Sequence, residues 1–253
     1  MFEKSSRIPT MQNSLETLLD AGLQVSCVLD VGMLTGTAPL IRTFPNVPHH
    51  LFEPVDLHFQ QLEKNYKNID SKLHHVALSD SDGEIYLACR AIHGDGRITH
   101  SEVVEKPVTT DDIPDLVSCK PIRRACLDTI LEGESIGNNL LLKIDVDGHE
   151  MSVLKGADKA LELASIVVIE APINRVELPH FFERSNYLLG KGFCLMDIVD
   201  LAYYDGVLWQ VDLVFVKKEI VDKMDRLRPF EANTFSFEKE KWYPSGDRLY
   251  KNR

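Results

Sequence analysis

The sequence predicts an α/β fold in which helices cover a mostly parallel sheet and an antiparallel hairpin comes last. Two strongly apolar runs, at 140–145 and 166–170, have the composition of strands that are buried on both faces. Helical stretches alternate with such runs along the chain, which favours parallel strands joined by helical crossovers. Runs at 192–199 and 208–216 are joined by a short segment around Asp205 and Gly206, which predicts the hairpin. The expected layout is therefore a mixed, Rossmann-like sheet.

The earlier strands are predicted where short apolar runs end at Gly, Pro or Asp residues. They are expected at 27–31, 49–53, 73–78 and 84–89. Helices are predicted where apolar residues recur three or four positions apart, or where a proline stands in a first helical turn. They are expected at 10–22, 37–44, 55–66, 149–163 in two pieces around Gly156, and 178–189.

One long segment, 91–121, breaks this rhythm. It contains Gly94, Gly96 and three prolines, and it shows little periodicity. A loop of roughly 30 residues is uncommon inside a compact domain and is usually a lid or a binding loop. We therefore expect three parts: an N-terminal helical segment at 1–26, a main domain at 27–216 with 91–121 as an inserted loop or lid, and a polar, aromatic tail at 217–253.

The composition indicates a globular protein with an excess of negative charge. The 253 residues include 28 Lys and Arg and 39 Asp and Glu, which gives a net charge of −11. Such a charge repels nucleic acid phosphates and anionic lipids, so neither is an expected partner.

The expected location is the cytoplasm. No apolar run approaches the roughly 20 residues of a membrane span, and the N-terminal residues lack the pattern of a signal peptide. The five cysteines are scattered and form no C-x-x-C pair, which indicates a reducing compartment without disulfides or structural zinc.

Four polar features directly follow predicted strands, the place where open parallel sheets bind ligands. They are the turn from Asp30 through Gly32 to Gly36, Glu53, the segment from Asp145 to Glu150, and Glu170. Glycines in the first turn let a ligand approach the backbone, and Glu53 is placed to accept hydrogen bonds from two ribose hydroxyls. The turn is not G-x-G-x-x-G, which disfavours a dinucleotide with a pyrophosphate. A nucleoside cofactor without phosphates, such as S-adenosylmethionine, needs no such loop.

Five sequence blocks follow one another between residues 27 and 171. They are Val28-Leu29-Asp30-Val31-Gly32 with Gly36, Leu51-Phe52-Glu53-Pro54, Val76-Ala77-Leu78-Ser79-Asp80 with Gly83, Leu127-Asp128-Thr129-Ile130, and Lys143 to Glu150 with Val153-Leu154-Lys155-Gly156-Ala157. With these blocks in this order, the chain resembles the FkbM-type S-adenosylmethionine-dependent methyltransferases, and the last block is the most specific. One departure is that Met33-Leu34 stands where the family often has Ala-Asn.

The resemblance implies a class I methyltransferase fold that methylates a hydroxyl, often on a sugar, glycan or natural product. It assigns cofactor contacts by position: Gly32 and Gly36 at the methionine end, Asp30 ordering that turn or meeting the cofactor's ammonium, Glu53 on the ribose, Ala77 and Leu78 beside the adenine, and Asp145 facing the reaction centre.

Methyl transfer to a hydroxyl requires a group that removes the hydroxyl proton. The catalytic candidates are Asp145, His149 and Glu150, and His149 is a candidate base because imidazole titrates near neutral pH. Alternatively, Asp145, Asp147 and Glu150 gather a divalent metal through oxygen ligands, although no sequence pattern supports one. Asp147 and Glu150 also have capping-box spacing, which predicts that they begin the helix at His149.

Two other interpretations stay open at this point. Tyr187 and Lys191 have the spacing of the Tyr/Lys pair of NAD(P)-dependent short-chain dehydrogenases, but no third glycine follows Gly36 in the required register. The other is a relative that binds a cofactor or a partner without turnover. For a methyltransferase, the expected partner is a small-molecule or glycan acceptor, and a homo-oligomer is compatible with the sequence.

Overall fold

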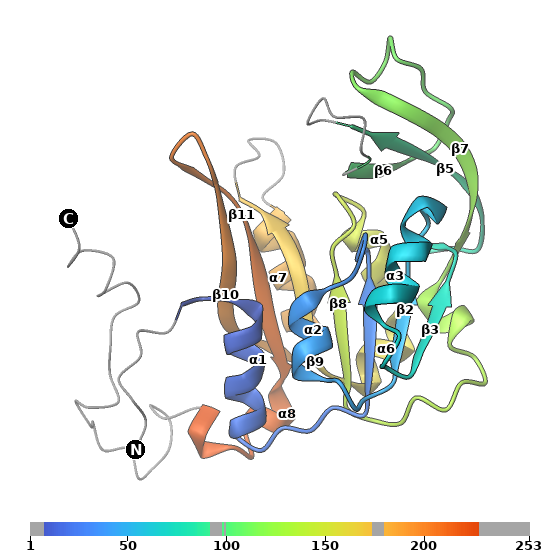
Figure 1. Ribbon diagram of the computed structural model, residues 1–253. Helices are drawn as coiled ribbons and strands as arrows, with labels where there is room; N and C mark the ends of the chain where they lie inside the picture. Colours follow the sequence, from blue (N-terminus) through green and yellow to red (C-terminus); the bar gives the residue numbers. More distant parts are fainter. Residues whose placement is uncertain (1–7, 92–97, 99, 174–179, 228–253) are drawn as a thin grey trace. The chain divides into compact units, whose positions relative to one another are not determined.

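The computed structural model describes residues 8–91, 98, 100–173 and 180–227 (Figure 1). The chain divides into two compact units. Val25–Glu170 forms the first, here called the central unit, and Met1–Gln24 with Ala171–Arg253 forms the second, here called the terminal unit.

The central unit contains the predicted parallel sheet. Its strands are β1 (Cys27–Val31), β2 (His49–Phe52), β3 (Ser71–His74), β8 (Leu140–Ile144) and β9 (Ala164–Pro172). They lie in the order β9-β8-β1-β2-β3, and each neighbouring pair is parallel. Every residue of β1, β2, β8 and β9 is buried, which is why β8 and β9 appear in the sequence as apolar runs rather than as alternating patterns.

The helices of the central unit are short, and all except α4 lie within the predicted helical stretches. They are α2 (Ala38–Thr43), η1 (Asp56–His58), α3 (Phe59–Asn65), α4 (Leu127–Ile130), α5 (Glu150–Lys155) and α6 (Asp158–Leu163). The break between α5 and α6 falls at Gly156, as predicted. A Cβ at Gly156 would lie 2.0 Å from the Ser79 carbonyl oxygen, so only glycine permits this approach of two backbones.

A second sheet in the central unit corrects two expectations. It consists of β4 (Ala77–Leu78), β5 (Gly83–Arg90), β6 (His100–Val104) and β7 (Leu116–Ala125), in the order β4-β7-β5-β6. The strand predicted at 73–78 is therefore two strands in two sheets. The segment 91–121 also contains β6 and the first part of β7, so it is not a loop throughout; Gly94 and Gly96 lie outside the described residues.

The second sheet packs against the rest of the central unit through apolar side chains. Val55, Leu87 and Cys89 form a buried cluster against which the side chains of Val103 and Ile122 pack. Figure 1 shows this sheet beyond the carboxyl ends of β1, β2 and β8, the edge at which the predicted site residues lie.

The terminal unit contains the predicted hairpin. Its elements are α1 (Met11–Asp20), α7 (His180–Gly190), β10 (Phe193–Tyr204), β11 (Val207–Lys217), α8 (Lys218–Val221) and η2 (Asp225–Leu227). The strands β10 and β11 pair in antiparallel fashion, which confirms the prediction. The N-terminal helix is attached to this hairpin, because Asp200 Oδ2 accepts a hydrogen bond of 3.0 Å from the Met11 N–H. The tail predicted at 217–253 lies outside the described residues from 228 on.

Among the helices that the structure describes, none is long and apolar enough to cross a membrane. All five cysteines are free thiols, and two of them, Cys27 and Cys89, are buried.

Candidate functional site

The turns that follow β1 and β8 are in direct contact at the carboxyl edge of the parallel sheet. Gly32 has a φ of +72°, and a Cβ at this position would lie 1.8 Å from the Asp145 carbonyl oxygen. The Asp145 N–H also donates a hydrogen bond of 3.1 Å to the Val31 carbonyl. Two residues predicted to share the site, Gly32 and Asp145, are therefore neighbours, and glycine is required between them.

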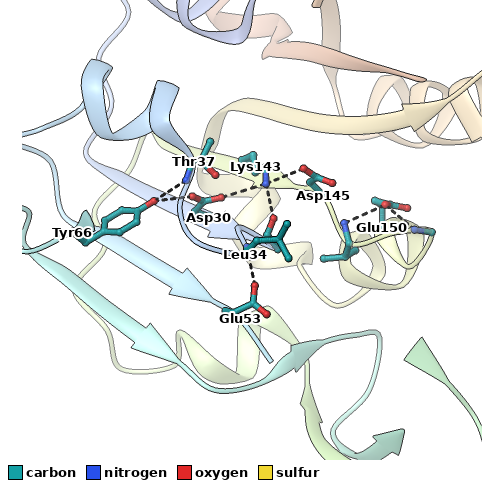
Figure 2. Close-up of polar contacts among 11 residues, drawn as sticks. Asp30, Leu34, Thr37, Glu53, Tyr66, Lys143, Asp145 and Glu150 are labelled. Atoms are coloured by element: carbon teal, nitrogen blue, oxygen red, sulfur yellow. Dashed lines mark hydrogen bonds and ion pairs between the residues drawn. The ribbon is translucent and has the colours of Figure 1, made fainter. Parts of the chain in front are cut away.

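A buried ionic cluster lies beside this contact (Figure 2). Lys143 Nζ donates to the Gly32 carbonyl at 2.7 Å, and it lies 3.2 Å from Asp145 Oδ2 and 3.7 Å from Asp30 Oδ1. The Lys143 side chain is 5% exposed and that of Asp30 is fully buried, whereas that of Asp145 is 41% exposed. The Lys143 ammonium thus forms ion pairs with two carboxylates, the buried one of Asp30 and the partly exposed one of Asp145.

Tyr66 completes the environment of Asp30. Its hydroxyl donates to Asp30 Oδ2 at 3.1 Å and accepts a longer hydrogen bond, 3.4 Å, from the Thr37 N–H. Burial, followed by the nearby charge of Asp30, raises the pKa of Tyr66, so the hydroxyl stays protonated and keeps donating. A Cβ at Gly36, where φ is +124°, would lie 3.1 Å from Tyr66 Cε2. Because Asp30 is enclosed in this way, its position suits ordering of the glycine turn rather than direct contact with a ligand.

Glu53, at the end of β2, connects two turns of the site. Its Oε2 accepts a hydrogen bond from the Leu34 N–H at 3.0 Å, and its Oε1 accepts one from the Val55 N–H at 2.9 Å. Burial raises the pKa of Glu53 to about 7, although both hydrogen bonds and the charge of Lys143 act in the opposite direction. Each carboxylate oxygen retains a further acceptor site, so the residue has the capacity predicted for two ribose hydroxyls.

Leu34 shows what the departure from the family pattern changes. Its φ is +51°, in the left-handed region that Asn tolerates better than Leu, and its side chain lies partly in solvent at 39% exposure. The hydrogen bond to Glu53 comes from its backbone N–H and does not depend on the side chain. The substitution therefore leaves the backbone contact in place.

Glu150 is buried and fixes the loop before α5. Its Oε1 accepts hydrogen bonds from the N–H groups of Gly148 at 3.0 Å and Val146 at 3.3 Å. The capping box predicted for Asp147 and Glu150 is not formed: α5 begins at Glu150, and no side chain caps it at His149. Glu150 reaches back to the preceding loop instead.

Asp147 connects the same loop to the second sheet. Its Oδ2 accepts a hydrogen bond of 3.2 Å from the N–H of Ser101, in β6. Burial raises the pKa of Asp147, and the charges of Asp145 and Glu150 act in the same direction, whereas the Ser101 hydrogen bond and His100 oppose the shift. Part of the segment predicted as a lid is thus hydrogen-bonded to the site.

His149 is directed toward the start of the second sheet. Its Nε2 lies 3.0 Å from Oγ of Ser79, a buried residue whose N–H donates to the Ala125 carbonyl. Burial lowers the pKa of His149. Ala77 and Leu78, predicted to flank the adenine, precede Ser79 as the buried strand β4 and pair with β7.

The remaining predicted features are a metal site, the Tyr187/Lys191 pair and Glu170. In the part of the chain that the structure describes, no three His, Cys, Asp or Glu residues are grouped so that they could hold a metal ion. This finding does not support the predicted alternative of a cation held by Asp145, Asp147 and Glu150. Lys191 Nζ lies 5.4 Å from the centre of the Tyr187 ring, and Glu170 is buried near the end of β9.

Lys143 and Tyr66 are site residues that the sequence analysis did not single out. Lys143 did carry a signal, because it is the only charged residue of the apolar strand β8. A buried charge of this kind needs an ionic partner. Tyr66 carried no comparable signal, since its partner Asp30 is 36 positions away in the sequence.

The fold is that of the class I, S-adenosylmethionine-dependent methyltransferases. The family model described as the methyltransferase FkbM domain matches residues 30–193. The chain belongs to the FkbM methyltransferase family. This membership confirms the resemblance and sets aside the short-chain dehydrogenase interpretation.

A curated relative and several solved structures are similar to this chain. The hexuronic acid methyltransferase AglP of Haloferax volcanii is 28% identical over 162 residues, which cover 63% of this chain and 61% of the relative. An rRNA methylase from Streptococcus thermophilus matches with 12% identity and a TM-score of 0.43, covering 81% of this chain and 93% of its own. A Methanococcus jannaschii fibrillarin pre-rRNA processing protein matches with 14% identity and a TM-score of 0.42, covering 81% and 74%.

Proposed function

We propose that this protein transfers a methyl group from S-adenosylmethionine to a hydroxyl of a sugar acceptor, with hexuronic acid units as the favoured class. The observation that carries the proposal is the accessible carboxylate of Asp145, 41% exposed, beside the Gly32 turn in a member of a methyltransferase family. The acceptor class is supported by the name of the relative AglP, a hexuronic acid methyltransferase. We further predict that the protein acts in the cytoplasm, does not bind nucleic acid and forms a homo-oligomer.

The residues around the glycine turn fit the cofactor. Glu53 offers one free acceptor site on each carboxylate oxygen to the ribose hydroxyls, and Ala77 and Leu78, both apolar and buried, are assigned to the adenine side. Gly32 and Gly36 would line the methionine end, with Asp30 ordering the turn from behind through Tyr66. S-adenosylmethionine, when bound, supplies a methyl group on a positively charged sulfonium.

Asp145 is the best placed of the three candidate bases. Glu150 is buried, and its Oε1 already accepts two backbone hydrogen bonds. Burial lowers the pKa of His149, so its imidazole is neutral, but its Nε2 already contacts the Ser79 hydroxyl. Asp145 is held by Lys143 through Oδ2, which leaves Oδ1 to accept the proton of an acceptor hydroxyl. We therefore assign the proton transfer to Asp145, and we assign the shape of the 145–150 loop to His149 and Glu150.

The second sheet is the proposed wall of the acceptor site. It lies beyond the carboxyl ends of β1, β2 and β8, and the Ser101–Asp147 hydrogen bond connects it to the site loop (Figure 1). Apolar packing against Val55 supports this role, because it places β5 beside the segment that follows β2. Acceptor selection is thereby assigned to β5, β6 and β7.

Two measurements test the proposed function. The first is thermal unfolding with S-adenosylmethionine, S-adenosylhomocysteine, NAD or NADP, in the wild type and in Glu53→Ala. Stabilisation of about 2.7 kcal/mol is expected at about 100 times the Kd of either adenosyl ligand, and it should be lost in the variant. The second is transfer of a labelled methyl group to glucuronic acid, galacturonic acid or glucose. Cofactor binding without transfer to any acceptor would instead support a non-catalytic relative.

A further inference from the structure

Lys143 is an unusual residue for its position. It lies in β8, in which the other four residues are Leu140, Leu141, Leu142 and Ile144, and every residue of the strand is buried. A lysine in such a strand loses most of its hydration, so it is retained only where partners compensate the charge. Partners of its ammonium include the Gly32 carbonyl, Asp30 and Asp145.

Neutralisation of Asp30 explains only part of this arrangement. Asp30 is fully buried and needs a nearby positive charge, yet it is the more distant carboxylate, at 3.7 Å. Asp145 is substantially hydrated and needs no such partner for stability, yet it lies closer, at 3.2 Å. The ammonium is therefore shared between the buried carboxylate and the surface carboxylate.

The contact to Gly32 fixes where the ammonium lies. The hydrogen bond of 2.7 Å to the Gly32 carbonyl is the shortest of the three, and the Gly32 turn itself touches the Asp145 backbone. Lys143 thus joins the backbone of the first turn to the side chain of the second (Figure 2). Movement of either turn changes the Lys143–Asp145 distance.

We propose that Lys143 is a positioning residue for methyl transfer, which holds one oxygen of Asp145 so that the other faces the acceptor hydroxyl. This inference rests on the proposed function of Asp145 as the base. Asp147 and Glu150 are the other acidic groups of this loop, and the charges of Asp145 and Asp147 repel each other. Lys143 takes no proton in this account and acts only through Asp145.

The test separates positioning from simple charge neutralisation. Lys143→Met alone leaves Asp30 buried without a cation, which is expected to lower the Tm. The informative comparison is therefore Asp30→Asn against the double variant D30N/K143M, because neither variant contains the buried Asp30 carboxylate that Lys143 neutralises. We expect D30N/K143M to have a Tm close to that of D30N but a kcat lower by about tenfold or more, with a smaller change in the Kd for S-adenosylhomocysteine than in kcat. Lys143→Arg should recover part of the kcat that Lys143→Met loses.

A second readout does not depend on turnover. Crystal structures of D30N and D30N/K143M with S-adenosylhomocysteine should show the Asp145 carboxylate displaced, or in two orientations, only in the double variant. An unmoved carboxylate, or a kcat in D30N/K143M within about twofold of D30N, overturns the proposal and limits Lys143 to the neutralisation of Asp30. Failure of the wild type to methylate any acceptor would refute the proposed function, while the Asp145 orientation would still decide the role of Lys143.

Discussion

Gly32 and Asp145 approach each other so closely that a Cβ on Gly32 would lie 1.8 Å from the Asp145 carbonyl oxygen. This contact joins the turn expected to hold the cofactor to the carboxylate expected to take the proton. Because the neighbouring atoms belong to the backbone, no side-chain rotation relieves the overlap.

Gly32→Ala should therefore be strongly destabilising, by about 3 kcal/mol or more, from steric overlap added to left-handed backbone strain. Gly133→Ala is the matched control, because Gly133 has a φ of +83° but no atom within 4 Å of its added Cβ. That variant should lose only about 1–2 kcal/mol, the strain alone. Urea unfolding of both variants makes the comparison, and equal losses would refute the steric explanation.

Glu53 should make cofactor binding dependent on pH near neutrality. Its pKa is raised to about 7, so at lower pH the carboxyl is protonated and loses one acceptor site for the ribose. The affinity for S-adenosylhomocysteine should rise between about pH 6 and 8 in the wild type and stay flat in Glu53→Gln. Isothermal titration calorimetry measures this, and identical pH profiles for the two proteins would contradict the assignment.

The same raised pKa has an effect on folding with the opposite pH trend. The folded protein binds the Glu53 proton more tightly than the unfolded chain does. The stabilisation from this proton is complete below the usual pKa of a glutamate and is lost as the pH rises through about 7. Without cofactor, Glu53→Gln should therefore gain stability relative to the wild type as the pH increases over this range, as chemical unfolding at several pH values would show.

His74 should contribute to acid unfolding. It stacks on Phe52, its Nε2 lies 3.1 Å from His50 Nδ1, and burial is the main reason that its pKa falls to about 4. A lowered histidine pKa contributes stability at pH values above the usual one, near 6.5, which is lost as the pH falls toward about 4. His74→Phe preserves a ring on Phe52 and should reduce the loss of Tm between about pH 7 and 5. An unchanged slope in this variant would exclude His74 as a contributor.

Leu34 offers a stabilising substitution. Leu34→Asn should raise the free energy of unfolding by about 0.5–1 kcal/mol, because Asn adopts the φ of +51° with less strain and removes an exposed apolar side chain. Leu34→Val should have the opposite effect, since a β-branched side chain is strained further in this region. Thermal unfolding of the two variants tests the sign, and a lower Tm for Leu34→Asn would contradict it.

The parallel sheet could be predicted from the sequence because burial on both faces requires an uninterrupted apolar run, as in β8 and β9. The separation of β3 and β4 into two sheets could not be predicted. Both pieces lie in one run, and β4 leaves the first sheet because it pairs with β7, nearly 50 residues later in the chain: Ala77 pairs with Arg124. Long-range pairing of this kind leaves no local pattern.

The candidate site could also be predicted only in part. Gly32, Glu53 and Asp145 could be predicted as neighbours because each follows a parallel strand, and such ends meet at one edge. That Asp145 is accessible whereas Glu150 is buried could not be predicted, because this difference depends on which side chain turns back toward backbone N–H groups. The ion pair between Lys143 and Asp145 could not be predicted either, since the position of the ammonium depends on the contact between two turns.

The most direct test of the account is the kcat of Asp145→Asn, measured with the acceptor that the wild type methylates and compared with His149→Gln. If Asp145 takes the acceptor proton, Asp145→Asn should lose about 100-fold or more in kcat and bind S-adenosylhomocysteine within about fivefold of the wild type, while His149→Gln loses much less. A kcat for Asp145→Asn close to that of the wild type, or a larger loss in His149→Gln, would contradict the assignment of the base.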